Sequence, residues 1–308
     1  MSINSFTGFC TNILREYAYR VDLPADFRTA DEAECADIRE AVLKDLMERA
    51  YENGCEGNHF REFVDSQGVG RDDRAIPDII LKVYSAARCH QDPQKWLDDC
   101  LDNVKLDGVT DAADTIWGKS LMDSLFDWLD VQIGVQRELL RRLERDEGVE
   151  KPIANIGALV QQLEYLRDSK TWDDVYTRKN VDFGKLTFSG KKYDPVLAEQ
   201  VKAVRNACKA ELESRTRCFA DDSGQVIADL RASTEAAQGI VELVRRFAAD
   251  YAALKRRRRI LDFGDLEHDT LDLLLGKSRT GPTAAAVEIG SRFREIMVDE
   301  YQDSNGVQ

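Results

Sequence analysis

A chain of 308 residues with 43% hydrophobic and 8% aromatic residues can bury a core, which excludes a wholly disordered protein. No apolar run approaches the roughly 20 residues that cross a bilayer, and the first ten residues lack the features of a signal peptide, so we expect a cytoplasmic protein without membrane contact. The net charge of −14 arises in residues 1–150, which hold 18 basic and 32 acidic side chains, whereas the remaining 158 residues hold 25 of each, so a phosphate-facing surface is expected there.

The cysteine and histidine residues show no pattern that would hold a metal ion or a disulfide framework. The seven cysteines are an odd number without a Cys-x-x-Cys pair, and the three histidines lie far apart in the sequence. Scattered thiols are typical of small buried side chains in a reducing compartment. A structural metal site is therefore not expected.

Helical periodicity runs through the first part of the chain. Thr29 and Glu32 have the spacing of a capping box, and apolar residues follow on one helical face as far as Ala50. Further helices are expected over residues 77–87 and in a region that contains Trp96.

Longer amphipathic helices are expected farther along. An apolar stripe at three- and four-residue steps runs from residue 121 to residue 143. Asp194 followed by Pro195 is typical of a helix start, and the same periodicity continues to Leu212. Another long helix is expected over residues 240–254.

Two glycine-containing stretches interrupt this pattern. Residues 178–194 predict a long loop or small hairpin, and residues 276–283 predict a linker. One strand is expected, and it ends at Val298. The sequence therefore predicts a mainly α-helical chain whose two ends differ from its helical body.

Three apolar residues, 296–298, lead directly into Asp299 and Glu300. Such a short apolar run is typical of a buried parallel strand, and ligands of open α/β sheets lie at the carboxyl ends of these strands. An aspartate and a glutamate at that point can hold hydrated Mg²⁺ and take a proton from water, the two tasks of nucleotide hydrolysis. An isolated acidic pair is more often a solvated tail, so this interpretation depends on the neighbouring segments.

Three separated segments resemble the UvrD/Rep-like superfamily 1 DNA helicases. Residues 294–305, which contain Asp-Glu-Tyr-Gln-Asp, are similar to motif II, with Ser304 where the family usually has threonine. Residues 260–266 resemble the Asp-Phe-x-Asp-Leu segment that precedes motif II. Residues 2–6 resemble the Thr-x-His-Ser-Phe motif that touches single-stranded DNA, with serine for the threonine and Asn4 for the histidine.

The long stretch between these segments is similar to AddA-type helicase/nuclease subunits of bacterial double-strand-break repair, as residues 27–34 and 90–97 indicate. The resemblance implies a fragment of a larger enzyme. Residues 1–25 and 260–308 would belong to the first RecA-like domain, a P-loop α/β domain. Residues 26–259 would form its large helical insertion, domain 1B.

The same resemblance implies residue roles. Asp299 would bind Mg²⁺, and Glu300 would act as the general base on the attacking water. Two residues would couple ATP to DNA: Gln302 and Asp303. Three residues at the N-terminal end would contact DNA: Asn4, Ser5 and Phe6. The partners implied are a duplex DNA end, its single strand and an AddB-type subunit.

A phosphate-binding loop needs the pattern Gly-x-x-x-x-Gly-Lys-Ser/Thr, whose backbone amides hold the phosphates. Two Gly-Lys-Ser triplets occur, at residues 118–120 and 276–278, but Ala113 and Leu271 stand where the upstream glycine is required. Neither triplet is therefore expected to bind phosphate. ATP and Mg²⁺ are expected as cofactors of the parent enzyme, and these 308 residues are expected to lack ATPase activity.

The densest basic run comprises Lys255, Arg256, Arg257, Arg258 and Arg259. Five consecutive residues span more than one helical turn, so they cannot share one face. The run either contacts DNA phosphates or forms a solvated helix end, and the sequence leaves both interpretations open.

Other chemistry-bearing residues have structural interpretations. Asp262 and Asp265 are expected to cap a helix rather than to bind a metal ion. The four tryptophans are expected to pack in the core rather than to stack on bases.

The leading hypothesis is part of an AddA-type ATP-dependent DNA helicase and exonuclease of recombination and double-strand-break repair, with weak affinity for duplex DNA. One alternative is a UvrD-like helicase without a nuclease. Another is a helical scaffold that binds proteins through its acidic first half.

Overall fold

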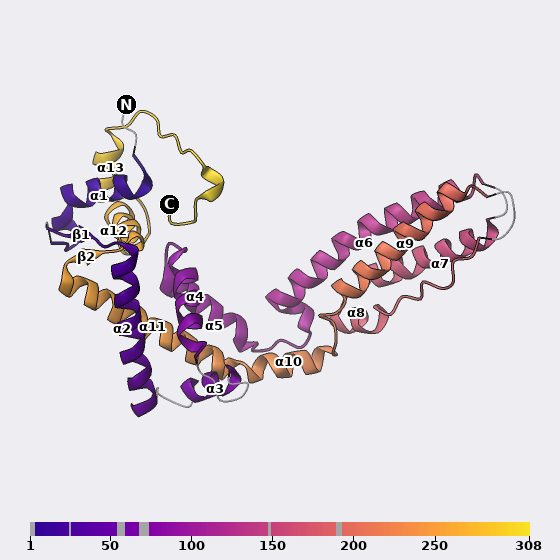
Figure 1. Ribbon diagram of the computed structural model, residues 1–308, viewed down its shortest axis with the longest axis horizontal. Helices are drawn as coiled ribbons and strands as arrows, with labels where there is room; N and C mark the ends of the chain where they lie inside the picture. Colours follow the sequence, from indigo (N-terminus) through magenta and orange to yellow (C-terminus); the bar gives the residue numbers. More distant parts are fainter. Residues whose placement is uncertain (1–3, 25, 54–58, 68–73, 147–148, 189–192) are drawn as a thin grey trace. The chain divides into compact units, whose positions relative to one another are not determined.

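The computed structural model describes residues 4–24, 26–53, 59–67, 74–146, 149–188 and 193–308. The chain forms two compact units. Unit 1 comprises Met1–Asp102 and Ser233–Gln308, and unit 2 comprises Asn103–Ala232. Helices dominate both units, which confirms the mainly α-helical prediction (Figure 1). Within the ranges just given, no helix combines the length and the apolar character needed to cross a membrane.

Unit 1 is built around a long central helix, α11 (Thr234–Arg258). The other elements of this unit are α1 (Phe6–Glu16), η1 (Ala18–Arg20), β1 (Arg28–Thr29), α2 (Glu32–Asn53), α3 (His59–Gln67), α4 (Ile76–Arg88), α5 (Pro93–Lys105, whose last residues belong to unit 2), β2 (Ile260–Leu261), α12 (Phe263–Leu275), α13 (Ala284–Gly290) and η3 (Tyr301–Asp303).

Helix α11 packs against α2, α3 and α4. Their shared core contains fully buried aliphatic and aromatic side chains, among them Ile38, Ile80 and Phe247. At Gly239 the backbone of α3 comes so close that a Cβ atom would lie 2.2 Å from the carbonyl oxygen of His59. Glycine is therefore required at this helix crossing.

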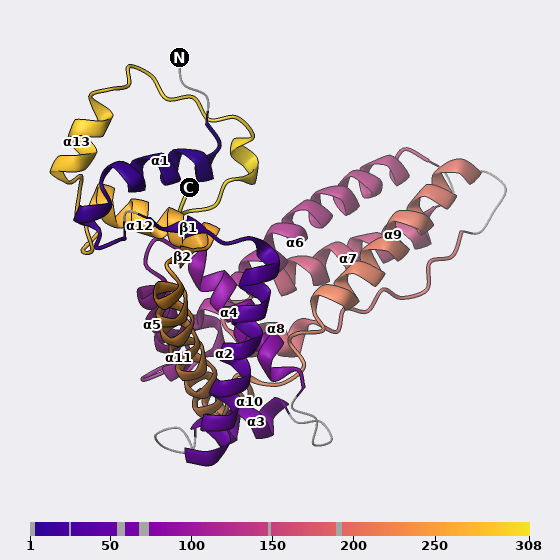
Figure 2. The ribbon, with the colours of Figure 1, turned by 60° about the vertical axis from the view of Figure 1, so that its left-hand side comes forward.

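A short parallel pair of strands joins the two ends of the long helical stretch. Arg28 of β1 lies opposite Ile260 of β2, and Thr29 lies opposite Leu261 (Figure 2). Residues near the predicted boundaries at 26 and 259 are thereby brought side by side within unit 1. Whether those boundaries separate folding domains stays a prediction.

The start of α2 differs from the prediction. Helix α2 begins at Glu32, three residues after Thr29, which lies in β1, so the expected capping box of Thr29 with Glu32 is wrong. The side chain of Asp31 occupies the capping position instead, and its Oδ1 accepts a hydrogen bond of 2.8 Å from the backbone N–H of Glu34. The helices predicted over residues 77–87, around Trp96 and over residues 240–254 are confirmed as α4, α5 and α11.

Unit 2 consists of three long helices with shorter elements at one end (Figure 1). Its elements are η2 (Ala112–Asp114), α6 (Ile116–Leu143), α7 (Glu150–Arg167), α8 (Trp172–Arg178), α9 (Pro195–Arg215) and α10 (Ser223–Ala232). The predicted stripe over 121–143 and the predicted helix start at Asp194 are confirmed by α6 and α9. The described part of residues 178–194 that follows α8 has no regular secondary structure, as predicted.

Both Gly-Lys-Ser triplets have structural roles. Gly118 lies in the first turn of α6, where a Cβ atom would come within 1.8 Å of the carbonyl oxygen of Ala112. Gly276 ends α12 with a φ of 72° and begins the predicted linker. The glycines are explained by close packing and helix termination.

Candidate functional site

The apolar residues before Asp299 do not form a strand. Ile296, Met297 and Val298 are 77%, 85% and 44% exposed, and the backbone there has no regular secondary structure. The prediction of a strand ending at Val298 is wrong. A strand needs a hydrogen-bonded neighbour, and in the part of the chain that the structure describes β1 and β2 pair only with each other.

Asp299, Glu300 and Gln302 come together on one tight turn. Glu300 adopts a left-handed conformation with a φ of 52° and precedes η3. Its backbone N–H donates to Oδ1 of Asp299 over 2.9 Å, and its carboxylate accepts a hydrogen bond from the Gln302 amide. Both carboxylates are exposed. The side chain of Asp303, predicted to couple ATP to DNA, lies outside the described residues.

This turn has suitable ligand chemistry for Mg²⁺ but does not complete a nucleotide site. Mg²⁺ prefers oxygen ligands and is usually held by one or two carboxylates together with substrate phosphates. Among the side chains that the structure describes, no three His, Cys, Asp or Glu residues cluster so that they could hold a metal ion. The turn therefore offers two carboxylates to Mg²⁺, and the phosphates of a nucleotide would have to supply further oxygen ligands.

The segment that follows the turn is anchored to unit 1. Val307 is buried, and the side-chain amide of Gln308 donates to Glu267 of α12 over 2.8 Å. The chain is therefore held on α12 shortly after the turn that carries the two exposed carboxylates.

The N-terminal segment predicted to touch DNA begins α1. The hydroxyl oxygen of Ser5 caps this helix by accepting a hydrogen bond of 3.1 Å from the N–H of Gly8. Asn4 is exposed, and Phe6 is half-buried. Helix α1 packs on α12, where Leu14 and Leu266 are fully buried. Ser5 therefore has a capping role in this structure, and its contact with DNA stays a prediction.

Helix α13 is tied to α1 by polar contacts that the sequence did not indicate. Arg292 donates to both carboxylate oxygens of Glu16, over 2.8 and 2.7 Å. The hydroxyl of Tyr17 donates to Glu288 over 2.7 Å. These contacts hold the end of α1 against α13 and Arg292, which precede the turn that carries Asp299 and Glu300.

The basic run divides into one buried residue and four exposed ones. Lys255 is 1% exposed, and its Nζ lies 2.6 Å from Asp262 and 2.5 Å from Asp265. Its Nζ also lies over the ring of Tyr251. This burial places Lys255 in the interior rather than on the phosphate-facing surface predicted for the run.

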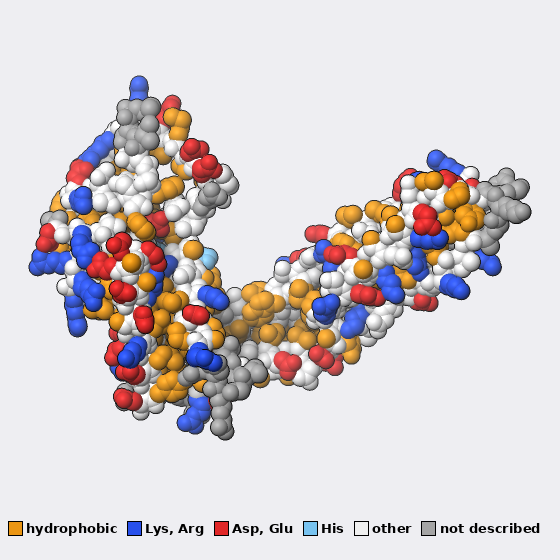
Figure 3. Space-filling model, in the orientation of Figure 1, with side chains coloured by type: hydrophobic (Ala, Val, Ile, Leu, Met, Phe, Trp, Pro, Cys, Tyr) orange, Lys and Arg blue, Asp and Glu red, His pale blue; other side chains and the backbone are white. Residues whose placement is uncertain are grey.

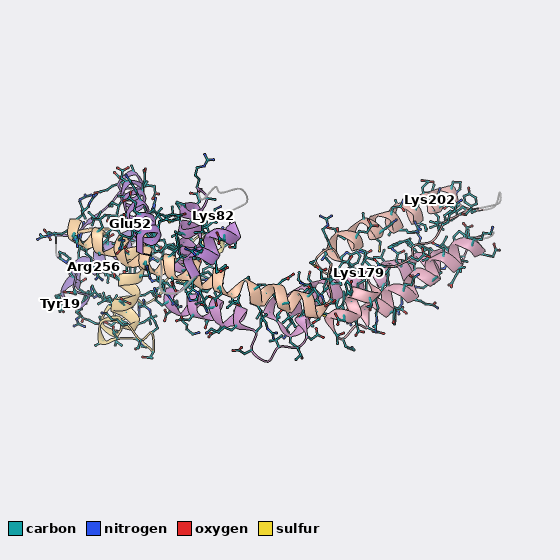
Figure 4. The ribbon with its side chains drawn as sticks, turned by 90° about the horizontal axis from the view of Figure 1, so that it is seen from below. Tyr19, Glu52, Lys82, Lys179, Lys202 and Arg256 are labelled. Atoms are coloured by element: carbon teal, nitrogen blue, oxygen red, sulfur yellow. The ribbon has the colours of Figure 1, made fainter. Side chains whose placement is uncertain are left out.

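The four arginines that follow Lys255 are exposed at the C-terminal end of α11, where Figure 4 labels Arg256. Arg259 has a φ of 55° and forms an ion pair with Asp26 over 2.7 Å. Within the described residues, Arg256, Arg257 and Arg258 are exposed and form no salt bridge. Their contact with DNA stays a prediction.

Asp262 and Asp265 form a capping box at the start of α12, as predicted. The N–H of Asp265 donates to Asp262 over 2.8 Å, and the N–H of Asp262 donates to Asp265 over 3.1 Å. Burial by itself would raise the pKa of Asp262, but the neighbouring Lys255 ammonium reverses this effect and lowers the pKa. Burial raises the pKa of Asp265, although Lys255 opposes the change.

Three further polar groups join this cluster, and the sequence reasoning missed them. Arg88 of α4 lies 3.3 Å from Asp265, and its carbonyl oxygen lies 2.9 Å from Nε2 of His268. Burial and the Arg88 charge lower the pKa of His268 to about 4. Burial and Asp265 raise the pKa of Asp269 to about 6. Arg88 is distant in the sequence, so only the spacing of the α12 residues offered a signal.

The tryptophans differ in burial. Trp172 packs in the core of unit 2 and donates to the carbonyl of Asp221 over 2.9 Å, as predicted. Trp96 stacks on His90, and Trp128 is half-buried in unit 2. Trp117 is 39% exposed on α6, so core packing is the wrong description for this residue.

Comparison with known proteins identifies the class of this molecule. A family model described as the UvrD/REP helicase N-terminal domain matches residues 1–308. The chain belongs to the UvrD/REP helicase N-terminal domain family.

Curated relatives give a more particular likeness. The chain is similar to proteins named as a subunit of an ATP-dependent helicase/nuclease, with 31% identity over 322 residues in Acetivibrio thermocellus and 32% over 317 residues in Geobacillus thermodenitrificans. These alignments cover 99% and 100% of the chain but 25% of each relative. The chain therefore spans about a quarter of the length of these relatives.

Proposed function

We propose that the chain serves an ATP-dependent DNA helicase of the AddA type, which acts in double-strand-break repair and recombination. The observation that carries this proposal is the family match over residues 1–308, which includes the Asp-Glu-Tyr-Gln-Asp run at residues 299–303 that resembles motif II. The similarity to proteins named as helicase/nuclease subunits favours this type over a helicase without a nuclease.

In this proposal Asp299 would hold Mg²⁺ and Glu300 would serve as the general base towards water. Gln302 and Asp303 couple the nucleotide to DNA. The exposure of both acidic side chains on one turn supports these assignments, because neither carboxylate forms an ion pair within the described residues. Hydrolysis of ATP bound with Mg²⁺ would supply the free energy for movement along DNA. The 308 residues contain no phosphate-binding loop, so alone they are expected to show no ATPase activity.

The proposed DNA-contacting groups are those that remain accessible at the two predicted positions. Arg256, Arg257 and Arg258 project from the end of α11 and supply positive charge for phosphates. Asn4, Ser5 and Phe6 form the other position. We also propose a cytoplasmic location and an AddB-type partner, and the names of the relatives, which call each of them a subunit, support the partner.

Duplex binding tests this proposal directly. We expect fluorescence anisotropy to show weak binding of a labelled duplex at low salt. Replacing Arg256, Arg257 and Arg258 with alanine should weaken binding and reduce the magnitude of the salt slope by about 2 to 3, because each phosphate contact contributes about 0.9.

A matched control removes three other exposed cations, Arg61, Arg246 and Lys277. The same loss of net charge at these positions should leave the slope nearly unchanged. Equal affinity and equal salt slope in both triple variants would show that Arg256, Arg257 and Arg258 do not contact DNA. If the unmodified 308-residue chain binds no duplex at any salt concentration, the result would favour the protein-binding scaffold.

A further inference from the structure

Helix α6 has a second apolar face that unit 2 does not bury. Its inner face packs in the core through residues such as Leu125, Leu129 and Ile133. On its outer face, four large apolar side chains are between 37% and 62% exposed: Trp117, Leu121, Val131 and Val135. With the half-buried Trp128 they recur at heptad-type steps, which is the pattern of a helix seam that packs on another helix. Figure 3 shows apolar side chains exposed along this part of unit 2.

A strip of charges with opposite signs at its two ends runs beside this seam. Asp123 and Asp127 lie 11 and 7 positions before Gly134, and Arg141 and Arg145 lie 7 and 11 positions after it. These spacings place Asp123, Asp127, Gly134 and Arg141 on one side of α6, whereas Arg145 lies in the turn that follows the end of the helix at Leu143. Reversing the helix about Gly134 places Asp127 opposite Arg141.

The two ends of the strip cannot satisfy each other within one molecule. Asp127 and Arg141 are separated by 14 positions, which is about 21 Å along a helix. In the described part of the chain Asp123, Asp127 and Arg145 form no ion pair, and Arg141 has only the exposed pair with Glu138 at 3.0 Å. At Gly134 an added Cβ atom would meet nothing within 4 Å, so a second backbone could approach closely there.

We propose that the outer face of α6 binds the same face of a second copy of this chain in antiparallel orientation. A two-fold axis beside Gly134 would place Val131 of each copy against Val135 of the other. Asp127 would pair with the other copy's Arg141. Such an interface is closed and self-complementary, so it produces a dimer rather than a filament. The inference does not rest on the proposed helicase function.

Charge exchange between copies tests this proposal by analytical ultracentrifugation of the 308-residue chain. The parent should form a dimer in a concentration-dependent manner. Asp127→Arg and Arg141→Asp should each raise the dimer Kd by about tenfold or more, because each places like charges opposite one another. An equimolar mixture of the two single variants should restore the dimer, since each heterodimer then contains only opposite-charge pairs.

Surface controls keep the result independent of folding. Val131→Asp should also dissociate the dimer, whereas Val196→Asp, at an equally exposed position on α9, should not. Circular dichroism should show the same helix content in every variant. A parent chain that is monomeric at all concentrations, or a mixture of single variants that fails to associate, would overturn the proposal.

Discussion

Two acidic segments of this chain resemble the same helicase family but differ in structure. One is packed within unit 1, and the other is exposed to solvent. Residues 260–266 form β2 and the start of α12, with Asp262 and Asp265 paired to a buried lysine. Residues 294–302 place their apolar side chains in solvent and leave Asp299 and Glu300 exposed. The comparison shows that a family motif predicts chemistry reliably only when its structural neighbours are also known.

The difference has a physical cause. The first segment obtains its partners from within unit 1, because β1 supplies the hydrogen-bonding neighbour, α11 supplies Lys255, and α4 supplies Arg88. The second segment requires a neighbouring strand, which the described residues do not provide. Hydrophobic residues that have no sheet to join remain exposed.

The largest expected effect comes from removing the buried cation. Lys255→Met should destabilise unit 1 by about 3–5 kcal/mol, because Asp262 and Asp265 would remain buried without their main counter-charge. Urea unfolding followed by circular dichroism measures this loss.

Arg257→Met is the matched control, because this neighbouring cation is exposed. Its cost should stay within about 0.5 kcal/mol. Adding Asp262→Asn and Asp265→Asn to Lys255→Met should recover part of the stability. Equal costs for the two single variants would show that Lys255 is not buried in the charge cluster.

A smaller effect should separate the two apolar runs. Leu261→Ala should cost about 2–4 kcal/mol because it removes a buried side chain of β2. Met297→Ala should cost less than about 0.5 kcal/mol because this side chain is exposed. A large loss from Met297→Ala in the same urea experiment would mean that residues 296–298 are packed.

The pH dependence of stability provides a third, still smaller effect. The pKa of His268 is lowered from 6.5 to about 4, so stability through this group is lost as the pH falls through that interval. The pKa of Asp269 is raised from 3.8 to about 6, so stability through this group is lost as the pH rises through that interval. The two contributions oppose each other.

Single variants should reveal each contribution. Relative to the parent, Asp269→Asn should gain stability as the pH rises from about 4 to 7, by at most about 3 kcal/mol. His268→Gln should gain stability relative to the parent as the pH falls over the same interval. Urea unfolding at several pH values measures both differences, and parallel profiles for the parent and both variants would exclude a titrating cluster on α12.

The sequence predicted the parts of the structure that depend on local pattern. Apolar periodicity indicated α6, α9 and α11, and the spacing of Asp262 and Asp265 indicated a helix cap. It did not predict that Thr29 would be taken into a strand, because β2 is distant in the sequence. It also gave no sign that Lys255 would be buried, since its neighbours in the run are four arginines.

Hydrogen exchange followed by mass spectrometry tests the difference between the two acidic segments most directly. Amides of residues 260–266 should exchange slowly, because the residues around β2 and the start of α12 are hydrogen-bonded, for example Leu266 N–H to the carbonyl of Asp262 over 3.1 Å. Amides of residues 295–299 should exchange close to the unprotected rate. Equal and strong protection of both segments would contradict the account, because it would require residues 296–298 to form a strand.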